Sequence, residues 1–333
     1  TESKRAIVIN DDELLIDIDF VSYYPSIILN NNYAPAHLDK EEFLKFYRQI
    51  YNERIEAKKR GDKVKANVYK IILNSTYGLS NDANSFLYDP EFTMRITING
   101  QLSLMMLYEM LAESIPDCQP LMQNTDGLEM IIPIGYKTRY LEICKEWEQI
   151  TNLQLEHDQY SKMIIRDVNN YIAVNTAGKS KCKGSFEYKD LALHKNKSFL
   201  IVPKALHAFF VDNILPEQFL QNNRNIFDYC GGVKIKGEWD FQQVCVDKEG
   251  IHRTPQQKTL RYYVSNTGCK IYKVNKNDKR EIQVEAGKWM QTIFNLHEEK
   301  PWEEYDINES YYLTKIYKEI DTIINKKSQL ELF

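Results

Sequence analysis

The stretch LLIDIDF, residues 14–20, decides the fold. Its side chains alternate in character, with Ile16 and Ile18 on one side and Asp17 and Asp19 on the other, which is the period of a β-strand. The stretch therefore predicts a buried strand that ends beside a carboxylate. Such an aspartate can bind Mg²⁺, and the turn after it can offer backbone N–H groups to a phosphate, although taken alone a structural cap is the commoner role.

Two helices are expected downstream, in residues 39–79, with a break at residues 61–62. In the second helix Lys70 and Asn74 stand one turn apart, so their side chains share a face and can address the same phosphate groups. An ordinary solvated polar face is the alternative. A further helix is expected around residues 98–112.

Residues 120–132 predict a hairpin whose tight turn is NTDG, residues 124–127. Asp126 in this turn can face Asp19 across the sheet. Two carboxylates that face each other repel unless a cation lies between them, so the pair predicts bound divalent metal ions. Strands are also expected at residues 170–174 and 184–188, and beyond residue 200 the pattern is helical and rich in loops.

In order along the chain, DFVSYYPSI (residues 19–27), KIILNSTYG (residues 70–78) and MQNTDG (residues 122–127) resemble the three signatures of the family B DNA polymerases. These have the forms D-x-x-S-L-Y-P-S-I, K-x-x-x-N-S-x-Y-G and Y-x-D-T-D-S. The second signature matches at every specified position, and NYAPAHL (residues 32–38) is similar to phage-type members. The resemblance covers about residues 14–188.

The resemblance implies an α+β fold with a palm sheet, two inserted fingers helices and a mainly helical C-terminal thumb. The expected segments are 1–38 for the first part of the palm, 39–80 for the fingers, 81–200 for the second part of the palm, and 201–333 for the thumb with a C-terminal tail.

The resemblance also implies the role of each matching residue. The implied catalytic residues are Asp19 and Asp126, and the metal-binding set adds Phe20 to them. Two Mg²⁺ ions held there would activate a primer 3′-hydroxyl and stabilise the leaving pyrophosphate. The implied nucleotide-binding residues are Ser22, Tyr23, Tyr24, Arg54, Lys58, Lys70, Asn74, Tyr77 and Gly78, and the implied DNA-binding residues are Tyr171, Lys183 and Gly184. Tyr24 would lie beneath the incoming sugar and exclude a 2′-hydroxyl.

Several positions depart from the signatures. Asn124 stands where the family has the first Asp of its third motif, Gly127 replaces the Ser, Met122 replaces the Tyr, and Tyr23 replaces a Leu. Asn124 is a natural variant, an engineered knockout or a sign of a degenerate polymerase. Asp17 either restores part of the missing charge or makes local hydrogen bonds.

Composition sets broader bounds. The 333 residues carry a formal net charge of −4, so only local basic surfaces, such as the one in residues 48–70, are suited to a phosphate backbone. The six cysteines have no metal-ligand spacing and predict free thiols in a reducing, cytoplasmic compartment. The similarity to phage-type members implies that this compartment is the cytoplasm of a bacterium or a phage-infected host. No apolar run is long enough to span a bilayer. The chain begins at Thr1, so we expect a piece of a longer protein or a processed one.

The expected function is DNA-templated DNA polymerisation, with primer-template DNA and deoxynucleoside triphosphates as partners. The alternatives are a catalytically inactive DNA-binding scaffold or another palm enzyme, such as an RNA-templated polymerase or a primase-polymerase. No segment resembles the exonuclease motifs, so the exonuclease and N-terminal regions are expected on a missing piece of the protein or on a separate chain. QLELF at the C-terminus resembles the Q-L-x-L-F motif that binds bacterial sliding clamps, through Gln329, Leu330, Leu332 and Phe333. The alternative is that these residues end a helix and pack on the thumb.

Overall fold

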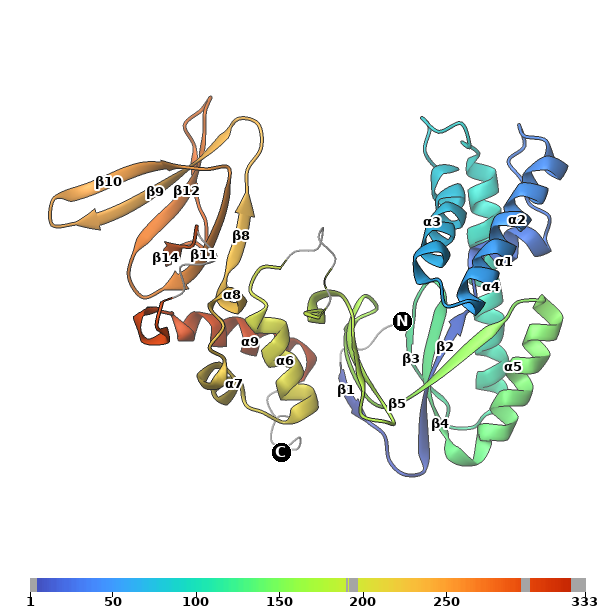
Figure 1. Ribbon diagram of the computed structural model, residues 1–333. Coiled ribbons are helices and arrows are strands. Elements are labelled where there is room, and N and C mark those ends of the chain that lie inside the picture. The colour runs from blue at the N-terminus through green and yellow to red at the C-terminus, as the bar shows by residue number, and fades with distance from the viewer. Residues whose placement is uncertain (1–4, 190, 192–196, 295–299, 325–333) are drawn as a thin grey trace. The chain divides into compact units, whose positions relative to one another are not determined.

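The computed structural model describes residues 5–189, 191, 197–294 and 300–324. These residues divide into two compact units, which are described one at a time (Figure 1). The first unit comprises residues 7–162 and 175–179, and the second comprises residues 5–6, 163–174 and the described part of residues 180–333. The four expected segments, 1–38, 39–80, 81–200 and 201–333, stay a prediction.

An antiparallel sheet forms the centre of the first unit, and LLIDIDF lies in its inner strand. The strands are β2 (Glu13–Phe20), β3 (Gln119–Gln123), β4 (Gly127–Pro133) and β5 (Leu155–Asp167), which begins in this unit and ends in the second. Their order is β3-β4-β2-β5, so β2 is hydrogen-bonded on both sides. The expected strand and hairpin are therefore confirmed.

The helices of this unit are α1 (Tyr23–Asn30), α2 (Lys40–Lys59), α3 (Lys63–Leu79), α4 (Pro90–Ser114) and α5 (Lys137–Thr151), with a 3-10 turn at Ile134–Tyr136. α1, α4 and α5 cover one face of the sheet, and α2 and α3 pack on each other and on α1. Ile16 and Ile18 of β2 are buried in the core that α1, α4 and α5 close. Trp147 of α5 is fully buried there, and its indole N–H donates to the carbonyl of Ser103 at 2.9 Å. The side chains at the alternate positions of β2, among them Asp17 and Asp19, point to the other face of the sheet.

The two helices expected in residues 39–79 are present as α2 and α3. Asp39 caps α2 by accepting a hydrogen bond from the amide of Glu42, and Asp62 caps α3 by accepting one from Lys65. Gly61 lies between the helices at a φ of 71°, a left-handed conformation that glycine adopts without steric cost. The break at residues 61–62 follows from these two residues.

The second unit contains a sheet that the sequence did not reveal. Its strands are β8 (Gly231–Lys234), β9 (Trp239–Asp247), β10 (Gly250–Gln256), β11 (Thr259–Ser265), β12 (Cys269–Asn275), β13 (Glu281–Gln283) and β14 (Trp289–Thr292). The order is β10-β9-β12-β14-β11-β8, with β13 beside β12. The expectation of a mainly helical segment from residue 201 onward is therefore wrong. Along much of β9 and β10 both faces carry polar or exposed side chains, so the period of two is hidden.

The remaining elements of the second unit are helices and short strands. They are β6 (Asn170–Asn175), β7 (Ser180–Cys182), a 3-10 turn at Gly184–Phe186, α6 (Ile201–Asp212), α7 (Pro216–Asn222), α8 (Ile226–Tyr229), a 3-10 turn at Trp302–Glu304 and α9 (Glu309–Ile323); β1 is Arg5–Val8. The strand expected at residues 184–188 is thus a 3-10 turn, and the strand lies just before it. The buried hydroxyl of Tyr312 accepts from the amide of Val264 and donates to the carbonyl of Tyr229, both at 2.8 Å.

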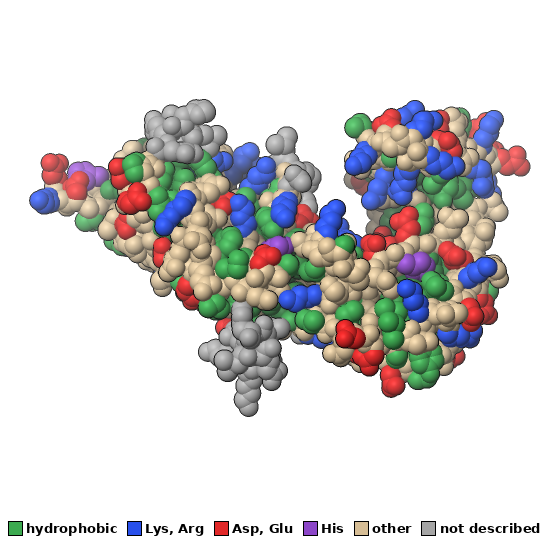
Figure 2. Space-filling model, turned by 60° about the horizontal axis from the view of Figure 1, so that its bottom comes forward, with side chains coloured by type: hydrophobic (Ala, Val, Ile, Leu, Met, Phe, Trp, Pro, Cys, Tyr) green, Lys and Arg blue, Asp and Glu red, His purple; other side chains and the backbone are tan. Residues whose placement is uncertain are grey.

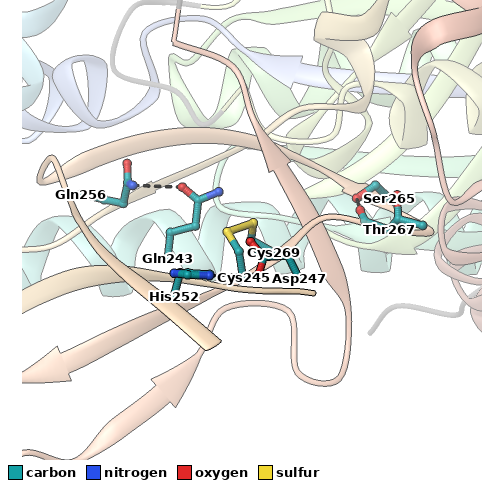
Figure 3. Close-up of a disulfide and its surroundings, with 8 residues drawn as sticks. All are labelled: Gln243, Cys245, Asp247, His252, Gln256, Ser265, Thr267 and Cys269. Carbon is teal, nitrogen blue, oxygen red and sulfur yellow. Dashed lines mark hydrogen bonds and ion pairs between the residues drawn. A yellow bond between two sulfur atoms is a disulfide. The ribbon is translucent and has the colours of Figure 1, made fainter. Parts of the chain in front are cut away.

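A disulfide joins Cys245 of β9 to Cys269 of β12 (Figure 3). The two residues are direct partners in the antiparallel ladder, with their Cα atoms 4.3 Å apart. The expectation that all six cysteines are free thiols is wrong for this pair. After β10 and β11 the chain comes back to β9, so that β12 pairs with β9 and the two cysteines lie opposite each other. The other four, Cys118, Cys144, Cys182 and Cys230, are free. In the described part of the chain no helix is long and apolar enough to cross a membrane.

We expect the double substitution Cys245→Ala with Cys269→Ala to lower the free energy of unfolding by about 3 kcal/mol. The cross-link spans 24 residues, and removing it returns loop entropy to the unfolded chain. Calorimetry should show the melting transition of the second unit roughly 5–10 °C lower. Cys118→Ala, which removes a free, half-buried thiol, is the control, and an equal shift in both variants contradicts the role of the cross-link.

Candidate active site

Asp19 and Asp126 come together at one end of the first unit's sheet. Asp19 is the Cα partner of Gly127 in the β2–β4 ladder, and Asp126 is the residue just before that partner. The amide of Phe20 donates to the carbonyl of Asp126 at 3.0 Å, which ties the turn to the end of β2. The predicted juxtaposition of the two residues on neighbouring strands is therefore present. Asp19 is half-buried and Asp126 is exposed.

Gly127 separates the side chains of Asp19 and Asn124. A Cβ atom at Gly127 would lie 3.1 Å from Oδ1 of Asp19 and 3.2 Å from Oδ1 of Asn124. The amide of Asp126 donates to the same Asn124 oxygen at 2.9 Å, so the side chain of Asn124 supports the turn. A carboxylate oxygen and an amide oxygen thus flank a glycine that leaves room between them.

The donors at this turn fit a magnesium ion. Mg²⁺ prefers oxygen ligands and is usually held by one or two carboxylates together with water and substrate phosphates. Among the described residues no group of three or more histidine, cysteine or acidic side chains could hold a metal by itself. The side-chain oxygens of Asp19 and Asn124 beside Gly127 are donors of the kind that such an ion takes. Asp17 is not part of the site, because it is 3% exposed and accepts a hydrogen bond from the hydroxyl of Tyr160 at 2.9 Å.

The chain turns sharply after β2. Ser22 has a φ of 48° and a ψ of 46° and stands at the N-cap of α1 without capping it through its side chain. Its hydroxyl instead accepts a hydrogen bond from Nη1 of Arg54 in α2. Arg54 is 7% exposed, burial lowers the pKa of its guanidinium, and Nε makes no hydrogen bond within the described residues. The turn, the N-terminus of α1 and a buried cation therefore lie together.

Three tyrosines link this turn to α3. The ring centroid of Tyr24 lies 5.7 Å from that of Tyr23 and 4.7 Å from that of Tyr77 in α3. Tyr23 is buried and donates its hydroxyl to the carbonyl of Gly100 in α4. A Cβ at Gly100 would lie 3.2 Å from Cε1 of Tyr24, so glycine leaves the space for that ring.

The carboxylate of Asp126 lies close enough to Tyr24 to affect the pKa of its hydroxyl. Burial, followed by the proximity of Tyr77 and Asp126, raises the pKa of Tyr24 to about 12. The same carboxylate contributes to the raised pKa of Tyr23, whose main cause is burial. Tyr24 is therefore a neutral, half-buried ring close to Asp126.

The polar face predicted for α3 is exposed to solvent. Lys70, Asn74 and Gly78 are exposed, as is Lys58 in α2, whereas Tyr77 is half-buried against Tyr24. Figure 2 shows lysine and arginine side chains gathered over the lobe that α2 and α3 form. A Cβ at Gly78 would meet nothing within 4 Å, so this position is open to a ligand.

The predicted DNA-binding residues lie together in the second unit. The amide of Lys183 donates to the carbonyl of Tyr171 at 2.9 Å. Tyr171 is buried, whereas Lys183 and Gly184 are exposed. The clamp-binding residues predicted at the C-terminus, Gln329, Leu330, Leu332 and Phe333, lie outside the described residues.

Two residues at the site were missed by the sequence analysis. Gly100 lies in a helix and carries no motif, and only the packing of Tyr23 and Tyr24 reveals its role. Glu156 of β5 is the direct partner of Asp19 on the other side of β2, which places both side chains on one face of the sheet. The β2–β5 pairing could not be read from the sequence, because β5 follows about 130 residues later.

Comparisons with known proteins show which proteins the sequence and the fold are similar to. No family model matches the chain. It is 23% identical over 264 residues to DNA polymerase 1 of Sulfolobus acidocaldarius, a match that covers 67% of this chain and 30% of that protein. The structure of the family B DNA polymerase from Pyrobaculum calidifontis is similar with a TM-score of 0.56 at 12% identity, over 98% of this chain and 46% of that one. The chain thus has a fold similar to that of a family B polymerase and spans less than half the length of either protein.

We expect Gly184→Ala to destabilise the second unit by roughly 1–3 kcal/mol more than Gly237→Ala does. The two glycines have φ values of 62° and 61°, so backbone strain is matched. A Cβ at Gly184 would lie 2.3 Å from the carbonyl oxygen of Asn169, whereas a Cβ at Gly237 meets nothing within 4 Å. Thermal melting of the two variants measures the difference. Equal melting temperatures would mean that the turn relaxes around the new methyl group.

Proposed function

We propose that the chain adds deoxynucleotides to a primer 3′ end under the direction of a DNA template, as a magnesium-dependent nucleotidyltransferase. The observation that carries the proposal is the placement of Asp19 and Asp126 beside the Ser22 turn and the Tyr24–Tyr77 contact. The proposed metal ligands, the proposed anion-binding turn and the open position at Gly78 of α3 then lie in one unit. The similarity to family B DNA polymerases supports this reading.

In this proposal Asp19, Asp126 and the backbone of Phe20 hold two Mg²⁺ ions. When bound, these ions lower the pKa of the primer 3′-hydroxyl and neutralise charge on the leaving pyrophosphate. The Asn124 side chain keeps Asp126 in place, because its oxygen accepts from the Asp126 amide at 2.9 Å. Asn124 then acts as a positioning residue, and two carboxylates remain for the metals.

The triphosphate would bind at the Ser22 turn. The amides at the N-terminus of α1 point toward an incoming anion, and the helix dipole favours negative charge there. The buried Nε of Arg54 has no hydrogen bond within the described residues, and a bound phosphate would satisfy it. Lys58, Lys70 and Asn74 complete the phosphate-binding set from the fingers face.

In this proposal the contact between Tyr24 and Tyr77 selects the sugar and the base of the incoming nucleotide. The ring of Tyr24 packs against the rings of both Tyr77 and Tyr23. A ring fixed in this way cannot move aside for an added 2′-hydroxyl, and the exposed Gly78 lets a base pair approach α3. Tyr171, Lys183 and Gly184 would contact primer-template DNA.

The other partners remain predictions. They are a bacterial-type sliding clamp, bound through residues 329–333, and a separate chain that carries the exonuclease and N-terminal regions. The similar proteins are more than twice as long as this chain, which leaves room for such regions elsewhere. Cytoplasmic localisation in a bacterium or phage-infected host also remains a prediction.

We expect Asp19→Asn and Asp126→Asn each to lower the rate of primer extension on the order of 10³-fold, because each removes negative charge that holds the metals. Gel-resolved extension of a labelled primer with Mg²⁺ measures the rate, and a mobility-shift assay should show that primer-template binding persists. Asp158→Asn, which changes an exposed carboxylate on the same sheet, is the control.

Primer-extension and DNA-binding assays of the unaltered chain also distinguish a polymerase from the alternative functions. A catalytically inactive scaffold would bind DNA yet fail to extend the primer, and rescue by Asn124→Asp would identify the decayed ligand. An RNA-templated or primer-synthesising enzyme would be recognised by extension on RNA templates or by synthesis without a primer. Near-normal extension by Asp19→Asn or Asp126→Asn contradicts the assignment of the site.

We expect Tyr24→Ala to raise the incorporation of ribonucleotides relative to deoxynucleotides by at least tenfold, because the ring that blocks the 2′-hydroxyl is removed. Single-nucleotide extension with each triphosphate gives the ratio of the two kcat/KM values. Tyr51→Ala, which alters a half-buried tyrosine of α2, is the matched control. Unchanged sugar selectivity in Tyr24→Ala would make Tyr24 an ordinary packing residue.

A further inference from the structure

A serine, a histidine and an aspartate of the second unit, none of them assigned a role above, form a contiguous array. The hydroxyl Oγ of Ser180 in β7 lies 2.8 Å from Nε2 of His207 in α6. Nδ1 of the same imidazole lies 3.3 Å from Oδ2 of Asp212, the last residue of α6. The order is nucleophile, base and orienting carboxylate; the first distance is that of a hydrogen bond, and the second is slightly longer than one.

The imidazole is held in one orientation. The side chain of His207 is 12% exposed, and the ring of Tyr188 packs edge-on against it with the centroids 5.5 Å apart. The carboxylate of Asp212 beside Nδ1 favours the tautomer with its proton on Nδ1, which leaves the lone pair of Nε2 directed at Ser180. Burial lowers the pKa of His207, against the opposing effect of Asp212, and the nearby Lys189 lowers it further. A neutral imidazole can accept the proton of the serine hydroxyl.

A small cavity opens beside the serine. It measures about 170 Å³ and is lined by Ser180, Cys182, Glu187, Tyr188 and Lys189. At roughly 30 Å³ per water molecule, it holds a group the size of about six waters. An acetyl or propionyl group fits, and a long acyl chain does not. The carboxylate of Glu187 in the lining disfavours acyl groups that carry a negative charge.

The cavity also contains the cation of Lys189, which can stabilise the negative charge that develops on the acyl oxygen during transfer. Lys189 lines it, with Nζ 5.2 Å from the centroid of the Tyr188 ring. An ammonium group in this position can stabilise an oxyanion. The neighbouring thiol is not a competing nucleophile, because burial raises the pKa of Cys182 to about 11 and keeps it protonated.

The geometry points to a second, nucleophilic site in this chain, in which Ser180 takes a small neutral acyl group from an activated ester or thioester and passes it to water. Oγ forms a bond to the acyl carbon while Nε2 of His207 takes the hydroxyl proton. The bond from carbon to the leaving oxygen or sulfur breaks, and the leaving group receives that proton. Water then attacks the acyl-serine, with His207 again moving the proton, so that a carboxylic acid and free Ser180 are restored.

The deciding experiment is covalent labelling with a biotin-tagged alkyl fluorophosphonate, followed by peptide mapping of the labelled residue. Fluorophosphonates bond to a serine only when a base activates it. We expect one label per chain, on Ser180, and none on Ser180→Ala. Labelling of His207→Gln should be about 10²-fold slower, the usual contribution of a general base. Ser310→Ala, which changes an exposed serine of α9, should label as the unaltered chain does.

Hydrolysis of p-nitrophenyl esters tests the size of the cavity. The acetate should be hydrolysed at least tenfold faster than the octanoate, with nitrophenolate release abolished in Ser180→Ala. Primer extension by Ser180→Ala should equal that of the unaltered chain, so this site and the proposed polymerase site can fail independently. Circular dichroism melting confirms that each variant is folded.

Two results would overturn the inference. One is a folded, unaltered chain that carries no label on Ser180. The other is Ser180→Ala hydrolysing the acetate as fast as the unaltered chain. Either would mean that the array only ties β7 to α6.

Discussion

The register between β2 and β4 is the constraint on which the first unit depends. It sets Asp19 opposite Gly127 and therefore beside the turn that carries Asp126. Side chains alternate along a strand, so a slip of one residue would turn Asp19 toward the helix-covered core and expose Ile18 to the other face. The hydrophobic burial of Ile16 and Ile18 thus holds the carboxylate in its place. The same burial that stabilises the sheet positions the proposed metal site.

Helices α2 and α3 are connected to this sheet through polar and aromatic contacts at the turn that follows β2. Arg54 of α2 donates to Ser22, and Tyr77 of α3 packs against Tyr24. Both contacts involve residues that we propose to bind the nucleotide. In the proposed function, a ligand that engages Arg54 or Tyr24 would share these side chains with the contacts that join α2 and α3 to the turn.

The second unit is stabilised by different means. Tyr312 of α9 bridges β11 and α8 with a hydroxyl that both accepts and donates, so its burial leaves no polar atom of that group unsatisfied. The disulfide between Cys245 and Cys269 fixes β9 against β12 at the more polar end of the sheet. These contacts join residues far apart in the chain, and they leave no local pattern in the sequence.

The sequence alone determined the strand at residues 14–20, the hairpin around Asp126 and the two helices broken at Gly61. Each of these follows from local chemistry, namely a period of two, a tight turn, and a glycine with flanking caps. It also determined which residues of those elements carry the family signatures. Only the tertiary structure decided that Glu156 lies beside Asp19, that Cys245 pairs with Cys269, and that a sheet occupies much of the region expected to be helical. Those features depend on pairing between distant strands, whose partners are chosen by the packing of the whole chain and not by the residues next to them.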